Sequence, residues 1–381
     1  MKAWETEQTP TTVLFLVAED WYFVSHRLPM ARAARSAGYE VHVATHVAAH
    51  ADAIRAEGFV LHELPWRRGT LNPASVGRMA WRVRELYLKL RPTIVHHVAL
   101  QPALIGSIAS EGLGLRVINA VTGLGFAFSS TRTPARLIRR PVAMAMRVLF
   151  NRPRVTVLVQ NDDDRDLVSR LGVHSDRIAL IPGSGVDTEH YQQMPEPSGE
   201  LTVAYVGRFL RAKGVETIVD AHRLLVDRGR QVTLILAGER DPMSRDSIPR
   251  STIDEWRRLP RVEILGHVDD VRTVWRRAHV ALLASQREGL PMSMLEAASC
   301  GRPMVSTDVP GSREIASQGR TALLVPVGDS EAMAAAITRL ADDGPLRRRL
   351  GDASRRLAAG RFSREQVGAA TLDLYHRVLA T

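Results

Sequence analysis

Residues 287–315 read R-E-G-L-P-M-S-M-L-E-A-A-S-C-G-R-P-M-V-S-T-D-V-P-G-S-R-E-I, and the rest of the chain is organised around them. The apolar run at residues 280–284, just before this stretch, predicts a buried strand. Pro291 suits the first turn of a helix, where its missing N–H has no partner to lose. Gly301 ends that helix, and residues 304–306 predict a second strand. The stretch is therefore a strand–helix–strand unit of an open α/β sheet, in which ligands bind at the strand-to-helix turn.

Two glutamates give this unit its chemistry: Glu288 on the loop and Glu296 about two turns into the helix. Ionised carboxylates only accept hydrogen bonds, so they suit the hydroxyl groups of a ribose or a pyranose. The free N–H groups at the start of a helix favour a phosphate. A sugar nucleotide carries both kinds of group. The alternative from the residues alone is a solvated loop charge at Glu288 and a helix-surface charge at Glu296.

The motif E-G-L-P-M-S-M-L-E-A at 288–297, followed by G-R-P-M-V-S-T-D-V-P-G at 301–311, resembles the E-x7-E motif of retaining family-4 glycosyltransferases. The resemblance extends over nearly the whole chain. It implies the GT-B fold, in which two doubly wound parallel-sheet, Rossmann-like α/β domains face a central crevice. It also implies that Glu296 holds the ribose of the donor and Glu288 its sugar hydroxyls. Three neighbours are expected to bind the donor as well: Gly289, Leu290 and Pro291.

A second motif, G-R-x-x-x-x-K-G at 207–214, follows the first strand of the second half of the chain. Arg208 and Lys213 suit a diphosphate, and Gly207 lets the backbone approach it. The motif matches the same family, in which such cations stabilise the leaving diphosphate without a metal. The resemblance further places Val268 at the nucleobase, and Gly238 is a weaker donor-binding candidate. The alternative is ordinary solvated charge at a helix start.

Candidates on the acceptor side come from the first half of the chain: Asp20, His26, His97, Thr122 and Gly123. Many members of the family carry His, and some carry Glu, where this chain has Thr122. Threonine is a poor base, which puts a general-base role there in doubt. A front-face mechanism, in which the leaving phosphate takes the acceptor proton, tolerates that departure. We count His97 and Thr122 with Glu288, Arg208 and Lys213 as catalytic candidates, and we expect His96 to be a buried core residue.

No metal cofactor is expected. Asp162, Asp163 and Asp164 could suggest a hard-cation site. They follow Asn161 and precede a helix, where acidic side chains cap the free N–H groups and complement the dipole.

The alternation of apolar strands and helices predicts two α/β domains, for which 381 residues with 45% hydrophobic content suffice. We expect an N-terminal acceptor-binding domain over residues 1–185 and a C-terminal nucleotide-sugar domain over residues 200–362. Residues 183–200, rich in Gly, Pro, Ser and Glu, predict a linker. The last helix, residues 363–381, resembles the family's helix that crosses back to the first domain.

A formal net charge of +10 favours anionic partners. Residues 132–154 contain seven arginines and no acidic residue, interleaved with apolar side chains. This composition predicts an amphipathic helix that lies on an anionic membrane, and the alternative is a helix packed on the sheet with its arginines in water. A second basic cluster contains Trp66, Trp81, Arg67, Arg68, Arg78, Arg82, Arg84, Lys89 and Arg91. Nucleic acid is not expected, since no recognised binding motif accompanies the charge.

Cys300 is the only cysteine, so an internal disulfide is excluded and a cytoplasmic location fits. It lies at the end of the Glu296 helix, where we expect a small packed residue rather than a nucleophile. No apolar run reaches the length of a transmembrane helix. Together with the basic segment, this predicts a peripheral protein on the inner face of the plasma membrane.

These features predict a retaining glycosyltransferase that moves a sugar from a nucleotide diphosphate sugar, by family habit a UDP-sugar, to a hydroxyl of a glycan. The N-A-V-T-G-L-G stretch at 119–125 resembles enzymes of bacterial surface-polysaccharide assembly, whose acceptors are linked to a polyprenyl diphosphate. Two alternatives remain. A sugar-nucleotide epimerase of the same fold converts donor without an acceptor, and a scaffold binds nucleotide sugar without turnover.

Overall fold

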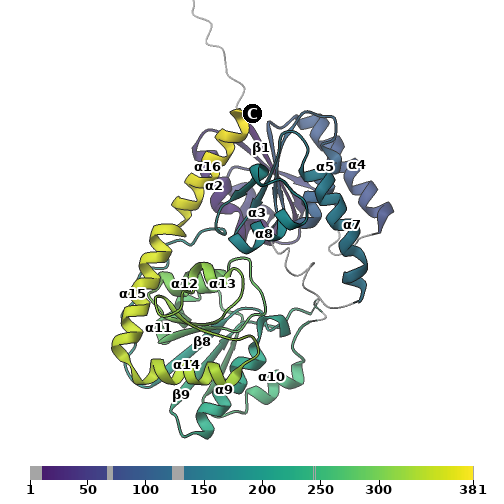
Figure 1. The fold of residues 1–381 in the computed structure, drawn as a ribbon. Helices are drawn as coiled ribbons and strands as arrows, with labels where there is room; N and C mark the ends of the chain where they lie inside the picture. Colours follow the sequence, from purple (N-terminus) through teal and green to yellow (C-terminus); the bar gives the residue numbers. More distant parts are fainter. Residues whose placement is uncertain (1–10, 67–71, 122–132, 243, 245, 381) are drawn as a thin grey trace, which may run out of the picture. The chain divides into compact units, whose positions relative to one another are not determined.

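The computed structural model describes residues 11–66, 72–121, 133–242, 244 and 246–380, with residues 133–138 described as backbone only. The chain divides into two compact units (Figure 1). Unit 1 contains residues 1–184 and 365–381, and unit 2 contains residues 185–364.

Unit 1 is built on a seven-stranded parallel sheet in the order β3-β2-β1-β4-β5-β6-β7. The sheet grows outward on both sides of β1, so the chain switches direction between β1 and β4. Helices cover both faces, and the strands are accordingly short apolar runs. The strands are β1 Thr12–Glu19, β2 Glu40–His46, β3 Val60–Glu63, β4 Ile94–Val98, β5 Arg116–Ala120, β6 Val155–Val159 and β7 Ile178–Leu180.

Three helices of unit 1 lie side by side: α4 Pro73–Leu90, α5 Leu100–Ala109 and α7 Thr133–Phe150 (Figure 1). The Asn72 side chain caps α4 by accepting from the Ala74 N–H, and Pro73 occupies its first position. The other elements of this unit are α1 Asp20–His26, α2 Leu28–Ser36, α3 Ala51–Ala56, α8 Asp162–Arg170, the 3-10 turn η1 Ser175–Arg177 and α16 Arg364–Ala380.

Helix α16, at the end of the chain, belongs to the core of unit 1. Val367, Leu374 and Tyr375 are buried in the same apolar cluster as α1, α2 and one face of the sheet. The Tyr375 hydroxyl lies 2.9 Å from His96 Nδ1, and the His96 ring stacks on Phe15. His96 is fully buried, as the sequence predicts.

Unit 2 is built on a six-stranded parallel sheet in the order β10-β9-β8-β11-β12-β13. The strands are β8 Leu201–Val206, β9 Val232–Ala237, β10 Val262–Gly266, β11 Val280–Leu283, β12 Met304–Thr307 and β13 Ala322–Val325. The helical elements are η2 Arg211–Lys213, α9 Val215–Asp227, α10 Arg250–Trp256, α11 Arg272–Arg277, α12 Met292–Ser299, α13 Ser312–Ile315, α14 Ser330–Asp342 and α15 Gly344–Arg361. A single apolar cluster fills both sides of this sheet.

The Gly- and Pro-rich stretch before β8, predicted to be a linker, has a defined place on unit 2. Val186 forms an isolated bridge with Ser363, and Arg364 Nη1 donates to Asp187 Oδ2 at 2.6 Å. Arg355 donates to the carbonyl groups of Thr188 and Tyr191. Side chains from distant parts of the chain therefore fix this segment, which its own composition does not reveal.

Candidate functional site

The predicted donor-binding residues of unit 2 lie on the loops that follow four neighbouring strands. In the order β10-β9-β8-β11, the loops begin at His267, Gly238, Gly207 and Ala284. All four strands are parallel, so these loops emerge at one edge of the sheet. The strand order reverses between β8 and β11, and such a switch point is where open α/β sheets bind ligands.

Lys213 and Glu288 form an ion pair at this edge. Lys213 Nζ donates to both carboxylate oxygens of Glu288, at 2.6 and 2.8 Å. Ser285 Oγ donates to Glu288 Oε1 at 2.6 Å. The Lys213 side chain is 28% exposed and that of Glu288 is 9% exposed. The motifs at 207–214 and 288–297 therefore meet through one partly exposed ion pair that a ligand can reach.

Arg208 lies on the same loop as Lys213 and is 47% exposed. Its Nη1 donates to Asp241 Oδ2 at 2.9 Å, and Asp241 lies on the loop after β9. The phenol of Tyr205 donates to the Arg208 carbonyl at 2.8 Å. Burial raises the pKa of Tyr205, the nearby Glu288 carboxylate raises it further, and Arg208 partly opposes this. Tyr205 is therefore a neutral donor next to both charged groups.

Two glycines let the β8 and β9 loops touch. Gly207 has φ +155° and Gly238 has φ +142°. A Cβ atom on Gly238 would lie 1.9 Å from the Gly207 carbonyl oxygen, which excludes any side chain there. Glycine at these positions therefore allows the backbones of the two loops to pack directly against each other.

Gly311 fixes the Glu288 loop from the other side. It has φ +77°, and a Cβ there would lie 2.4 Å from the Glu288 carbonyl oxygen and 2.3 Å from that of Gly289. The Glu288 N–H donates to the Pro310 carbonyl at 3.3 Å. Pro310 and Gly311 thus hold the backbone of Glu288 in place by close contact.

Glu296 lies on α12 and is hydrogen-bonded to Tyr191 of the segment before β8. Burial raises the pKa of Glu296 to about 7, although the bond from Tyr191 and the nearby Arg364 lower it. Burial, followed by the charge of Glu296, raises the pKa of Tyr191. Glu296 is therefore an acceptor whose ionisation falls in the physiological range.

The remaining donor-side candidates form the lining of the same edge. Pro291 is the N-cap residue of α12 and is buried, whereas Gly289 and Leu290 are partly buried on the loop before it. Val268 is partly buried on the loop after β10. All of them lie in unit 2 with Glu288 and Glu296.

Asp20 of unit 1 is fully buried at the end of β1. One carboxylate oxygen accepts from the N–H groups of Ala48, Ala49 and His50, and the other accepts from Trp21. Burial raises its pKa, but these four bonds outweigh burial and the net pKa is lowered. Asp20 is thus engaged in holding the loop after β2.

His97 is fully buried, and both of its ring nitrogens have protein partners. Nδ1 lies 2.7 Å from Asn119 Oδ1, so it carries the proton, and Nε2 accepts from the Tyr87 hydroxyl at 2.8 Å. Burial lowers the pKa of His97 to about 4, although Asn119 opposes this. Gly106 leaves room for the ring. Both ring nitrogens of His97 are therefore bonded to protein groups, and we assign His97 no direct contact with a substrate.

His26 is partly buried at the end of α1, where its ring stacks on Tyr22 at 4.3 Å. Its Nδ1 lies 2.6 Å from Ser25 Oγ. Thr122 and Gly123 lie outside the described residues.

Among the described residues, no three His, Cys, Asp or Glu side chains are placed to hold a metal ion. The side chain of Asn161 caps α8 by accepting from the Asp164 N–H at 2.7 Å, so the Asp162–Asp164 run starts a helix as predicted. Cys300 is buried, and burial raises the pKa of its thiol to about 12, which fits a packed residue.

Four site residues were missed from the sequence: Tyr191, Tyr205, Asp241 and Ser285. Ser285 lies two residues after the end of β11, and Asp241 lies four residues after the end of β9. Their positions just after strands of the same edge could have marked them as site residues. Tyr205 reads as an ordinary strand residue. Tyr191 lies 105 positions before Glu296 in a segment with no helix or strand, and no local pattern marks it.

Comparison with known proteins agrees with this geometry. Residues 200–343 match the family model described as glycosyl transferases group 1, and residues 12–161 match that of glycosyl transferase 4-like proteins. The capsular polysaccharide biosynthesis glycosyltransferase CapM of Staphylococcus aureus is 24% identical, over 77% of this chain and 79% of CapM. An enzyme of Campylobacter jejuni is 22% identical over 93% of this chain and 95% of that enzyme. Its name is N,N'-diacetylbacillosaminyl-diphospho-undecaprenol alpha-1,3-N-acetylgalactosaminyltransferase.

A solved structure gives the same class of fold. HepE of Anabaena, in complex with UDP-glucose, superposes with a TM-score of 0.76 at 18% identity, over 96% of this chain and 99% of HepE. Two parallel-sheet α/β units with this likeness define the GT-B fold. The chain belongs to the glycosyltransferases of that fold, as the E-x7-E and G-R-x-x-x-x-K-G motifs predict.

Proposed function

We propose that this protein is a retaining glycosyltransferase that transfers a sugar from a UDP-sugar to a hydroxyl of a lipid-linked glycan in bacterial polysaccharide biosynthesis. The ion pair between Lys213 and Glu288, beside Arg208, carries the proposal. These three groups give one edge of unit 2 both cations for a diphosphate and an acceptor for sugar hydroxyls.

The donor binds along this edge in the proposed arrangement. The diphosphate lies at the loop with Arg208 and Lys213, beside the close contact of the Gly207 and Gly238 backbones. The N–H groups at the start of α9, together with the positive end of the helix dipole, favour binding of the anionic diphosphate. Glu288 accepts from hydroxyls of the sugar, and Glu296 accepts from the ribose. UDP is the preferred nucleotide because the related fold of HepE holds UDP-glucose.

The cations act when the bond from the anomeric carbon to the diphosphate oxygen breaks. Negative charge then grows on the leaving UDP, and Arg208 and Lys213 stabilise it from fixed positions. A free phosphate oxygen accepts the proton of the attacking hydroxyl on the same face of the sugar. The anomeric configuration is retained. No metal and no protein base is needed in this scheme, so it accommodates Thr122.

The acceptor is proposed to be a glycan on a polyprenyl diphosphate, because the related Campylobacter enzyme acts on a diphospho-undecaprenol substrate. Helix α7 of unit 1 gives a way to approach a membrane. Arg140, Met144 and Val148 are exposed on it, which mixes cationic and apolar side chains on one surface. No helix among the described residues is long and apolar enough to span a bilayer.

Membrane contact through α7 is tested by sedimentation with vesicles rich in phosphatidylglycerol. Arg139→Glu with Arg140→Glu should leave most of the protein in the supernatant. The matched unit 2 variant Arg223→Glu with Arg257→Glu should sediment like the wild type. Equal sedimentation of both variants would remove α7 from the proposal.

The transferase is tested by incubating the protein with UDP-sugars, with and without a polyprenyl-diphosphate-linked glycan, and by assigning products with NMR. The proposal predicts acceptor-dependent release of UDP and a new glycosidic bond with the donor's anomeric configuration. An altered sugar nucleotide formed without acceptor would establish the epimerase instead. Binding of donor with no product in either condition would establish the scaffold.

A further inference from the structure

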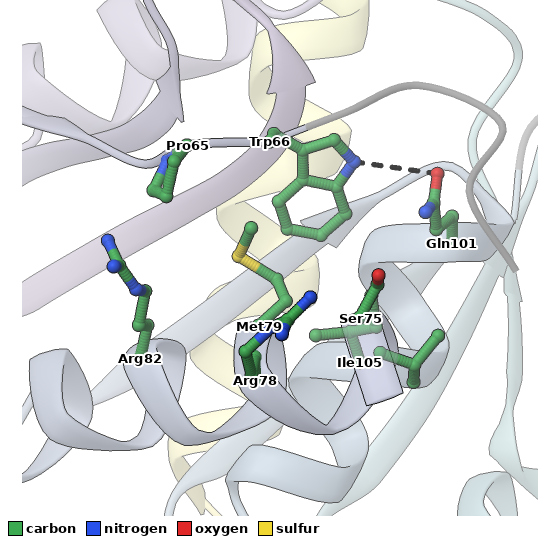
Figure 2. Close-up of a pocket in the computed structure, with 9 residues that line it drawn as sticks. Pro65, Trp66, Ser75, Arg78, Met79, Arg82, Gln101 and Ile105 are labelled. Carbon is green, nitrogen blue, oxygen red and sulfur yellow. Dashed lines mark hydrogen bonds between the residues drawn. The ribbon is translucent and has the colours of Figure 1, made fainter. Parts of the chain in front are cut away.

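A cavity of about 360 Å³ lies in unit 1 (Figure 2). It lies where the chain leaves β3 and enters α4, with the start of α5 on its other side. Pro65 and Trp66 follow β3 after Leu64, and Gln101 lies in the first turn of α5, after β4. The cavity is therefore at the carboxyl edge of the unit 1 sheet, the edge at which open α/β sheets bind ligands. Its volume is in the range of small-molecule sites.

One part of the cavity wall is apolar. Trp66 and Ile105 are buried in its wall, and Met79 lies between the two arginines of α4 along the helix. The Trp66 indole N–H donates to Gln101 Oε1 at 3.4 Å, which holds the ring in place (Figure 2). A ring, a thioether and a branched alkyl group favour an apolar or flat ligand part.

The cavity is cationic at its α4 wall. Arg78 and Arg82 are one helical turn apart, both are exposed, and both line the cavity. Neither makes an ion pair or a hydrogen bond with the described part of the chain. No acidic side chain among the described residues lines the cavity. Two guanidinium groups that start one helical turn apart and have no anionic partner there suit a phosphate or a diphosphate.

The two arginines of the lining favour an anionic ligand over a plain sugar or a plain nucleotide base. Sugar hydroxyls need acceptors such as the carboxylates of the donor site, and here the neutral polar side chains are Ser75 and Gln101. A ligand with an anionic group next to an apolar part satisfies both walls. Helix α4 also carries an exposed Trp81 (60%) and an exposed Leu88, two turns apart, and amphipathic indoles of this kind favour the membrane interface.

We propose that this cavity binds the diphosphate head of the lipid-linked acceptor, with Arg78 and Arg82 on the phosphate oxygens and the first isoprenoid unit against Trp66, Met79 and Ile105. This assignment rests on the proposed function, since it names the site in unit 1 that selects a lipid diphosphate as the carrier of the glycan.

The test uses the full chain and geranyl diphosphate, a soluble amphiphile with the same head and two isoprene units. Binding is measured by isothermal titration calorimetry for the wild type and for Arg78→Ala with Arg82→Ala. The double variant should lose at least tenfold in affinity. Lys89→Ala with Arg170→Ala removes the same charge from exposed positions of unit 1 and should change affinity less than twofold. Equal affinity in the first variant and the wild type would overturn the proposal.

Two further ligands separate the sources of an anion. Inorganic pyrophosphate should bind the wild type at least tenfold more weakly than geranyl diphosphate, and equal binding would reduce the cavity to a phosphate site and overturn the lipid assignment. Vesicles of phosphatidylglycerol should not displace geranyl diphosphate, and displacement would assign the cavity to bulk lipid. UDP binding, a property of unit 2, should be the same in both variants. Absence of UDP binding in the wild type would instead count against the proposed function.

Discussion

The carboxyl edges of the two sheets use polar side chains in opposite ways. In unit 2, Lys213 and Glu288 are bonded mainly to each other and stay partly exposed. In unit 1, Asp20 and His97 are fully buried and bonded to backbone and core groups. A ligand can exchange with a side-chain partner at the surface, whereas it cannot reach a group that the fold already encloses. A polar residue at a strand end is thus a site residue only when its partners can be replaced.

Exchanging a protein partner for a ligand also costs less free energy in unit 2 than in unit 1. Moving Lys213 from Glu288 to a diphosphate replaces one anion by another, and the Glu288 carboxylate gains sugar hydroxyls. Moving Asp20 would leave four backbone N–H groups without their carboxylate acceptor, and each lost hydrogen bond to a charged group costs about 1.5–3 kcal/mol. The first exchange is suited to catalysis and the second would disrupt the loop after β2.

The largest effect on activity should follow from Lys213→Ala. It removes a cation that faces the growing charge on the leaving diphosphate, so turnover should fall by about 10²–10³-fold. Steady-state release of UDP measures this. Arg211→Ala is the matched control, because Arg211 lies on the same short helix but pairs with Glu216. If both variants turned over at the wild-type rate, Lys213 would not act on the leaving group.

The largest effect on stability should follow from Asp20→Ala in the other unit. Four N–H groups lose their acceptor, so the free energy of unfolding should fall by at least about 3 kcal/mol. For a unit of this size that lowers the unfolding midpoint by roughly 6–12 °C. Asp52→Ala, whose carboxylate is exposed, is the control and should shift the midpoint little. An Asp20→Ala protein with an unchanged midpoint and lost activity would make Asp20 a substrate ligand after all.

A smaller effect concerns pH. The pKa of Glu296 is raised to about 7, so the carboxylate that accepts the ribose forms as the pH rises through 7. UDP-glucose, whose diphosphate is ionised throughout, should bind about tenfold more tightly at pH 8 than at pH 6 if only the ionised form accepts the ribose. Glu296→Gln should bind more weakly and without this pH dependence.

The same raised pKa makes a prediction about folding. The folded state holds the Glu296 proton more tightly than the unfolded state, so this group's contribution to stability falls as the pH rises from about 4.5 to about 7. In the Glu296→Gln variant, the unfolding midpoint should depend less on pH over that range. A steeper fall in the variant would contradict the raised pKa.

The sequence predicts the fold in most of its parts because local pattern and tertiary structure agree there. Helices α4 and α9 begin at residues with a local helix-start signal: Pro73 is the first residue of α4, and Gly214 is the N-cap of α9. Helix α1 has a weak local signal, because W-Y-F-V consists of aromatic and β-branched residues that are common in strands. In the folded chain Phe23 of this helix is buried in the core of unit 1.

The site was predictable where motif residues carry it and not where distant residues do. Arg208, Lys213, Glu288 and Glu296 are candidates through the family resemblance, and the structure brings the Lys213 and Glu288 motifs together at one edge of the sheet. Tyr191 and Asp241 are partners that only the folded chain brings to Glu296 and Arg208. The sequence cannot show that the hydrogen-bonding atoms of Asp20 and His97 are already bonded to other groups of the protein.

The central claim, that this edge of unit 2 binds the nucleotide diphosphate, is tested most directly by thermal unfolding with UDP, GDP and ADP. Ligand at a hundred times its dissociation constant adds about 2.7 kcal/mol to the free energy of unfolding. UDP should raise the midpoint of the wild type and of Arg257→Ala, whose ion pair with Asp254 matches the one lost in Arg208→Ala. Arg208→Ala should lose most of that rise. A wild type that responds to none of the three nucleotides, or an Arg208→Ala variant with the full UDP shift, would contradict the account.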